Sequence, residues 1–396
     1  MINLKKAPFY ILTFIQTLFF LPFFLQSNIG SDWDAYSLIG TYLIFEESGQ
    51  YFPSRPPGFP IYELIVGLIS KFSFLGIEKS LLLLQYIIMI LLNYLIFLFF
   101  QKRKDSNILI FIIILFSPIY LISSFTVIDY TFGALFGFLS IFVAQYGSKR
   151  YRSLIPLFLA ISIGARLSNI IFLIAVLISL YQKNIKLTRL FNTLFYTVFL
   201  SVIFYAPTHL NLFRYLKNLG YKTSELLCIF NLTNIDHNLY DRLGRFVLKQ
   251  INYMGFIAFV IFLIVIIVSK KQIQKKHYPL LIVFLLFELS FLRLPTEEGH
   301  LLPAFIAFML IIKDFKFHNK FLNLTILFLV ISSFLDLKFY TIDVIDSAST
   351  AELGFYLNKG YLIEEYELRE QVVNKNYHYE NSKLTLLEAW SNGCPN

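Results

Sequence analysis

Residues 80–100 read SLLLLQYIIMILLNYLIFLFF and contain no charged side chain. A helix of about 20 apolar residues is as long as the hydrocarbon core of a bilayer is thick, about 30 Å. Lipid offers no hydrogen bonds to the backbone, and the run lacks the apolar–polar alternation of a barrel strand, so it predicts a membrane-spanning helix. Similar runs recur along most of the chain, and this pattern decides the fold class.

Ten further apolar runs surround this stretch. They lie at 8–26, 107–125, 128–146, 154–166, 168–182, 189–206, 251–269, 279–294, 301–312 and 321–336. The composition agrees, because 15% of the 396 residues are charged, against about 25% in an average soluble domain. The sequence therefore predicts an all-α polytopic membrane protein with about 11 transmembrane helices. We assign residues 1–336 to this transmembrane module and residues 337–396 to a small C-terminal tail.

Residues 57–75 are apolar but are interrupted by Pro60, Glu63, Gly67 and Lys71. We expect them to lie on the membrane surface as an interfacial helix within a first outer loop, residues 27–79. The short loops on the other side then hold 18 of the 34 basic residues and two of the 25 acidic ones, a net charge of +16 against −7 for the remainder. Positive charge collects in cytoplasmic loops. The N-terminus should therefore be cytoplasmic, and the long polar loops and the C-terminal tail external. The overall charge of +9 does not indicate a nucleic-acid partner.

Two carboxylates follow the first apolar run, in the segment SDWDAY (31–36). A carboxylate at a membrane surface is partly desolvated, which suits it to act as a general base. Trp and Tyr also prefer the headgroup level, so an interfacial anchor is the alternative interpretation. On the first interpretation, Asp34 and Asp32 are candidate catalytic residues, with Asp34 preferred.

Two further polar positions lie at predicted outer helix ends or loops. The segment YFPSRPPGFP (51–60) has four prolines that fix an extended backbone, and its Arg55 is a candidate substrate-binding cation. Asp129 is the acid between two apolar runs that almost no loop separates. It is either a helix-capping residue or a third catalytic carboxylate.

Arg166 interrupts an apolar run within GARLSN (164–169). An unpaired charge inside a bilayer costs on the order of several kcal/mol. The guanidinium therefore requires either a buried acid, such as Asp129 or Glu288, or an anionic substrate. We treat Arg166 as a candidate substrate-binding residue.

The segment RLPTEEGHLLP (293–303) gathers charged groups between two predicted spans. Arg293 and His300 are candidate substrate-binding residues within it. A histidine with nearby carboxylates can also bind a divalent metal ion, and the candidate ligands are Asp129, Glu297, Glu298 and His300. A solvated histidine in a turn is the simpler alternative.

In this order, the features resemble the GT-C superfamily of membrane glycosyltransferases, the class that includes protein O-mannosyltransferases and the aminoarabinose transferase of lipid A. The resemblance covers roughly residues 1–312 in layout. The matching positions are Asp32 or Asp34, Pro56 with Pro57, Asp129, Arg166, and Arg293 with His300 ahead of Leu301, Leu302 and Pro303. The sequence departs from the family where the frequent Asp-Glu pair is replaced by Asp32-Trp33-Asp34, and where the large C-terminal domain of some members is reduced to about sixty residues.

The resemblance implies transfer of a sugar from a polyprenyl-phosphate carrier, a membrane lipid, to a hydroxyl of a glycan, lipid or protein acceptor. It implies a site on the outer face of a bacterial plasma membrane, where a carboxylate takes the hydroxyl proton and cations or a metal ion stabilise the leaving phosphate. The rival functions are a transporter or flippase of lipid-linked glycans, and a glycan polymerase or ligase. Transporters tend to show internal repeats and ionisable residues near the midplane. Here the charges lie toward the predicted outer ends.

Overall fold

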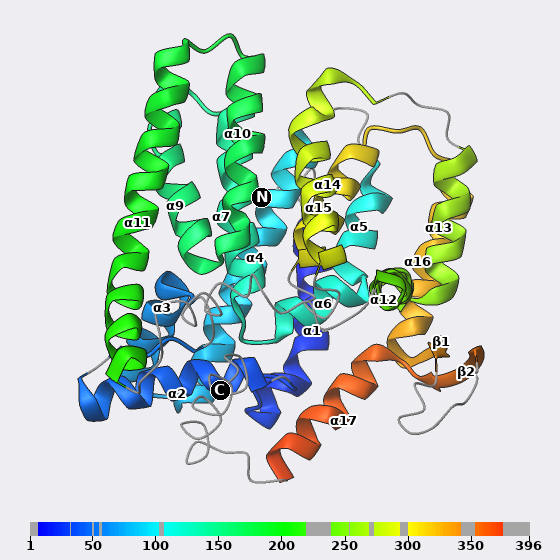
Figure 1. The fold of residues 1–396 in the computed structure, drawn as a ribbon. Helices are drawn as coiled ribbons and strands as arrows, with labels where there is room; N and C mark the ends of the chain where they lie inside the picture. The colour runs from blue at the N-terminus through cyan, green and yellow to red at the C-terminus, as the bar shows by residue number, and fades with distance from the viewer. Residues whose placement is uncertain are drawn as a thin grey trace.

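The computed structural model describes residues 7–31, 33–49, 51–54, 58–102, 107–218, 239–252, 254–268, 273–293, 300–341 and 353–374. Helices make up most of this part (Figure 1). The helices of the first half are α1 (Ala7–Gln26), α2 (Trp33–Ser48), α3 (Pro60–Lys71), α4 (Ile77–Gln101), α5 (Ile108–Phe116), α6 (Pro118–Phe125), α7 (Asp129–Tyr146), α8 (Lys149–Arg152), α9 (Ile155–Ala165), the 3-10 turn η2 (Leu167–Ile170), α10 (Ile171–Gln182) and α11 (Leu187–Asn218). The second half contains α12 (Leu239–Asn252), α13 (Phe256–Val268), η4 (Lys275–His277), α14 (Tyr278–Arg293), α15 (Leu301–Ile312), α16 (Asn319–Phe334), the strands β1 (Leu335–Thr341) and β2 (Leu353–Lys359), and α17 (Tyr361–Asn374).

Over its described residues, each apolar run of the sequence corresponds to a helix or to a pair of successive helices, except that the last two residues of the run 321–336 lie in β1. Within the described residues, three helices are long and apolar enough to cross a membrane: Ala7–Gln26, Ile77–Gln101 and Leu187–Pro207. The number rises to five if the bent pairs α5–α6 (54°) and α12–α13 (91°) each count as one span. Four shorter apolar helices, of 10–17 residues, accompany them. The architecture is therefore that of a helical membrane protein.

Four loops that the charge pattern predicts to be cytoplasmic meet at one end of the bundle. The amide of Asn107 donates to the carbonyl oxygen of Lys313 at 3.2 Å, which joins the loop before α5 to the loop after α15. The side-chain amide of Gln182, at the end of α10, donates to the carbonyl oxygen of Lys275 at 2.7 Å. His277 Nε2 lies 3.0 Å from Asp314 Oδ2. In Figure 1 the connections from α10 to α11 and from α15 to α16 lie at the top.

Helices α2, α3 and α17 lie at the opposite end, which we call the α2–α3 end (Figure 1). Helix α3 coincides with the predicted interfacial helix, and Pro60 at its first turn suits a helix start because proline has no N–H to leave unsatisfied. Helix α2 lies within the predicted first outer loop, for which the sequence pattern predicted no separate helix at this place. It packs against α3, and both lie across the bundle rather than along it.

Small residues bring α7, α9 and α3 close together. The Ser162 hydroxyl of α9 donates to the carbonyl oxygen of Gly133 in α7 at 2.7 Å. A Cβ atom at Gly164 would lie 2.5 Å from Ile61 of α3, so only glycine permits this approach. Small residues at helix contacts allow such close packing inside membranes. The contacts fix the ends of α7 and α9, where Asp129 and Arg166 lie.

The C-terminal tail contains a two-stranded antiparallel sheet that the sequence analysis did not anticipate. Helix α16 ends at Phe334, so residue 336, the predicted end of the last span, lies in β1. The tail then returns to the bundle: the Tyr361 hydroxyl donates to the carbonyl oxygen of Phe116 at 3.1 Å. Gly360 lies so close to the backbone of α16 that a Cβ there would be 2.3 Å from Phe334 N.

Candidate functional site

A buried ion pair joins two of the residues that the sequence singled out. Arg166 Nη1 lies 3.2 Å from Asp129 Oδ2, and the two residues are 6% and 1% exposed. Asp129 is the first residue of α7, and Arg166 follows α9 with an extended backbone (φ −160°, ψ 123°), which separates α9 from η2. Removing one partner would leave a buried charge uncompensated, which typically costs about 3–5 kcal/mol. Of the two acids proposed as partners for Arg166, it is Asp129 that makes the contact.

Two aromatic rings enclose the guanidinium. Its central carbon lies 4.6 Å from the centroid of Tyr130 and 5.9 Å from that of Phe59. Tyr130 belongs to α7, and Phe59 is the residue before α3. A cation over an aromatic face is stabilised by the ring quadrupole, and more so when it is desolvated. Arg166 is thus held between the start of α3 and the start of α7.

A second buried carboxyl, Glu63, lies in the first turn of α3. It accepts hydrogen bonds from the Ser54 amide at 2.7 Å, from the Ser54 hydroxyl at 2.5 Å, and from the Tyr51 hydroxyl. Burial raises the pKa of Glu63, against the opposing effect of these hydrogen bonds. The bonds also tie the described part of the proline-rich segment to α3.

Glu63 is close to the ion pair. The Glu63 amide donates to the carbonyl oxygen of Phe59 at 2.9 Å, and the ring of this same Phe59 lies beside the Arg166 guanidinium. The Tyr205 hydroxyl of α11 donates to the carbonyl oxygen of Ile163, three residues before Arg166, at 2.9 Å. Two carboxyls and one guanidinium therefore converge at the α2–α3 end, contributed by α3, α7 and the end of α9.

A cavity of about 460 Å³ lies beside this cluster, between α2, α3 and α11. Its lining is mostly apolar and includes Ile61, Leu64 and Phe204, with Glu63 and Lys71 among the polar residues. Ile61 and Phe204 are also the residues nearest to Gly164, two positions before Arg166. A mostly apolar cavity with a few polar groups at one side has the character of a ligand site.

The first-loop acids belong to the same end of the molecule. Asp34 lies in the first turn of α2 and is half-buried, whereas Asp32 lies outside the described residues. The amide of Val127 donates to the carbonyl oxygen of Ile29 at 2.8 Å. This bond joins the chain five residues before Asp34 to the chain two residues before Asp129, so the two carboxylate-bearing segments start side by side.

The remaining predicted residues are not gathered with this cluster in the described part of the chain. Arg55, Glu297 and Glu298 lie outside the described residues, and Arg293 ends α14 with a side chain whose placement is not described. His300 precedes α15, is 8% exposed, and has its Nδ1 atom 3.3 Å from the Ser290 hydroxyl. Its ring is therefore buried and not solvated as the simpler interpretation expected.

The predicted metal site depends on these undescribed positions. Among the residues that the structure describes, no group of three or more His, Cys, Asp and Glu side chains is arranged to hold a metal ion. Asp129 is engaged with Arg166, and His300 with Ser290. Glu297 and Glu298 would have to supply the missing ligands.

Glu63 is the site residue that sequence reasoning missed. In the sequence, Glu63 was interpreted only as an interruption of an apolar stretch. Its position in the first turn after Pro60 was a usable signal, because a residue there lies at the same end of the helix as the proline-rich segment. No protein-family model, curated protein or solved structure matches the chain.

Proposed function

We propose that the chain is a GT-C-like membrane glycosyltransferase with about 11 transmembrane helices. It moves a sugar from a polyprenyl-phosphate carrier to an acceptor hydroxyl at the outer face of the membrane. The observation that carries the proposal is the buried Asp129–Arg166 pair, at the same end of the bundle as the first-loop acid Asp34 and beside an apolar cavity.

Arg166 is the group proposed to bind the phosphate of the carrier. A guanidinium stays charged at any relevant pH, and its planar N–H donors match phosphate oxygens. Asp129 and the rings of Tyr130 and Phe59 hold this guanidinium in one orientation. The apolar cavity lined by Ile61 and Phe204 suits the hydrocarbon part of the carrier, because that part needs no polar partner.

The reaction is a displacement at the sugar. The acceptor hydroxyl oxygen bonds to the anomeric carbon, and the bond from that carbon to the phosphate oxygen breaks, with the electron pair leaving on the phosphate. Asp34 or Asp32 takes the proton that the hydroxyl loses. Arg166 stabilises the negative charge that develops on the leaving phosphate, since a fixed cation in a desolvated site is most effective there.

Binding of decaprenyl phosphate to the purified protein in lipid nanodiscs tests the role of Arg166. Because Arg166→Met alone would strand the Asp129 charge, the informative variant is the neutral pair Arg166→Met with Asp129→Asn. We expect it to weaken decaprenyl-phosphate binding by about tenfold or more, the loss of at least one charge-assisted hydrogen bond. Arg150→Met, at an exposed position at the other end, is the matched control and should bind normally.

The structural alternative gives a different result. If Arg166 only holds α9 against α7, the neutral pair variant would bind decaprenyl phosphate as tightly as the wild-type protein. Its unfolding temperature would still change. That outcome would contradict the proposed phosphate site.

A further inference from the structure

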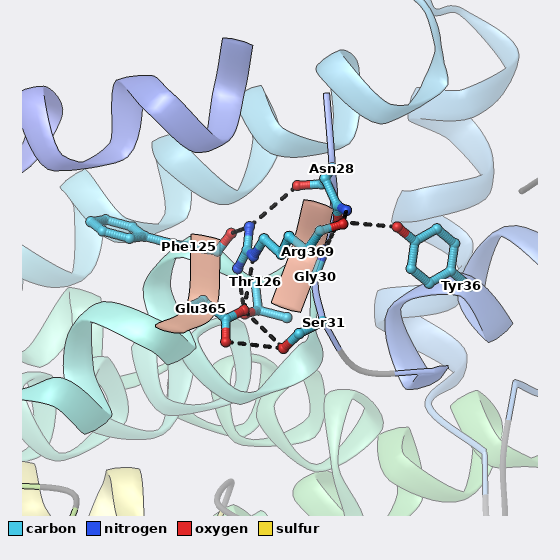
Figure 2. A network of polar contacts seen from close by, with 8 residues as sticks. All are labelled: Asn28, Gly30, Ser31, Tyr36, Phe125, Thr126, Glu365 and Arg369. Carbon is cyan, nitrogen blue, oxygen red and sulfur yellow. Dashed lines mark hydrogen bonds and ion pairs between the residues drawn. The ribbon is translucent and has the colours of Figure 1, made fainter. Parts of the chain in front are cut away.

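The side chain of Arg369, in α17, is buried at the α2–α3 end of the bundle and is 0% exposed (Figure 2). Its Nη1 atom donates to the carbonyl oxygens of Asn28 and Phe125, each at 3.2 Å. Its Nη2 atom donates to the Thr126 hydroxyl at 2.9 Å. The guanidinium carbon also lies 4.5 Å from the ring centroid of Phe23. One side chain from the tail thus bridges the end of α1 and the segment between α6 and α7.

The contacts continue to both sides of Arg369. Its Nε atom donates to Glu365 at 2.8 Å, and Glu365 accepts from the Ser31 hydroxyl at 2.9 and 3.0 Å. The Asn28 side-chain amide donates to the carbonyl oxygen of Arg369 at 2.5 Å, and its oxygen accepts from the Tyr36 hydroxyl at 3.0 Å. Burial raises the pKa of Tyr36 to about 12, so this hydroxyl remains a donor at neutral pH.

We call this set the Arg369 clasp: Asn28, Ser31, Tyr36, Thr126, Glu365 and Arg369. Its members flank one carboxylate-bearing segment on both sides and directly precede the other. Asp34 lies between Ser31 and Tyr36 in the chain, and Asp129 follows Thr126 by three residues. Figure 2 shows Ser31 in contact with Glu365 of the tail, and Tyr36 in contact with Asn28, which itself contacts Arg369 of the tail.

Stability alone does not account for such a network. A buried ion pair such as Arg369–Glu365 is often no more stable than apolar packing of similar volume, because desolvation offsets the attraction. The guanidinium provides instead a set of N–H donors in fixed directions toward three chain segments. That property defines the relative position of the segments more closely than apolar contact does.

We propose that Arg369 is a positioning residue for sugar transfer, and that through the clasp it sets the separation between the first-loop acids and the Asp129–Arg166 pair. This inference rests on the proposed function. Arg369 contacts neither substrate nor the reacting atoms. It acts by holding Asn28 and Ser31 on one side and Thr126 on the other.

Two variants break the clasp to different extents. Arg369→Met removes every N–H donor, and Ser31→Ala removes only the hydroxyl that links Glu365 to the first loop. Glu367→Ala is the matched control, because Glu367 lies on the same helix in an exposed pair with Lys359. In nanodiscs we would measure hydrogen exchange of residues 28–36, decaprenyl-phosphate affinity, and turnover as release of decaprenyl phosphate from a panel of decaprenyl-phosphate sugars in the presence of acceptor hydroxyls.

We expect faster exchange in residues 28–36 for both clasp variants and unchanged decaprenyl-phosphate affinity. Turnover should fall on the order of a hundredfold for Arg369→Met, as displacement of catalytic groups by about 1 Å typically causes, and less for Ser31→Ala. Unchanged exchange in Ser31→Ala would overturn the clasp even if Arg369→Met did not fold. Faster exchange with wild-type turnover would overturn the positioning role. A wild-type protein that transfers no sugar would overturn the proposed function, while the exchange result would still decide whether the clasp holds the loop.

Discussion

At the scale of single residues, Asp129 and Glu63 are both buried carboxyls of the same cluster, but they have different partners. Asp129 faces a guanidinium at 3.2 Å. Glu63 accepts from the amide and hydroxyl of Ser54 and from the hydroxyl of Tyr51, which are neutral donors. Burial without a cationic partner favours the protonated form of a carboxyl, and it raises the pKa of Glu63.

Glu63 should make the stability of the protein depend on pH. Its pKa in the folded protein is raised above the ordinary value of 4.5. The folded state then binds this proton more tightly than the unfolded state, so the stabilisation is complete below pH 4.5 and is lost as pH rises through the raised pKa. Glu63→Gln removes the titration and keeps the size of the side chain.

Thermal unfolding in nanodiscs across this range measures the effect. We expect the wild-type protein to gain stability relative to Glu63→Gln as the pH is lowered toward 4.5. Glu367→Gln, a 40% exposed carboxyl, should give no such trend. A wild-type-to-Gln difference that stays constant with pH would contradict the assignment.

Asp129 and Arg166 were recognisable from the sequence, because a charge inside an apolar run has to be compensated. The same reasoning named Asp129 as one of two acids that could pair with Arg166, and the structure shows this pair. Arg369 was not recognisable as a functional residue, because its role depends on contacts with distant residues. One of them, Asn28, is 341 positions away and carries no distinctive sequence signal of its own. A residue that acts by bridging distant segments carries no local signal.

At the scale of elements, the apolar runs predicted the helices but not their interruptions or their amphipathic neighbours. The run 107–125 is divided by Ser117 and Pro118, because the residue before a proline avoids the helical conformation. Helix α12 was not predicted because it is amphipathic. Its apolar and polar residues are interspersed along the sequence, and a search for continuous apolar runs does not detect this pattern. Strand β1 begins within the predicted last span because its first residue, Leu335, continues the apolar run of the helix before it.

At the scale of the whole molecule, the described loops sort into two ends. At one end, hydrogen bonds link the loops near Asn107, Gln182, His277 and Asp314. Helices α2, α3 and α17 lie at the other end. The first group belongs to the loops with the net charge of +16, so we expect that end to be cytoplasmic.

Cysteine labelling in intact cells tests this orientation. The native Cys228 and Cys394 are first replaced by serine, because Cys228 lies in the long polar loop 207–250 and Cys394 in the C-terminal tail, both predicted to be external. In that background, a cysteine at the exposed position of Lys183 should be protected from a membrane-impermeant reagent, and one at Lys359 should react. Labelling in permeabilised cells controls for accessibility. The reverse pattern would contradict both the topology and the external site.

The central claim is that a first-loop carboxylate drives sugar transfer from a polyprenyl phosphate, and turnover of Asp34→Asn and Asp32→Asn measures it directly. Asparagine keeps the size of the side chain and removes its basicity, so we expect one of the two variants to lose turnover by about a hundredfold or more. Decaprenyl-phosphate affinity should be unchanged. Glu47→Gln, an exposed carboxyl at the other end of α2, should transfer sugar normally. Full turnover in both aspartate variants would contradict the account.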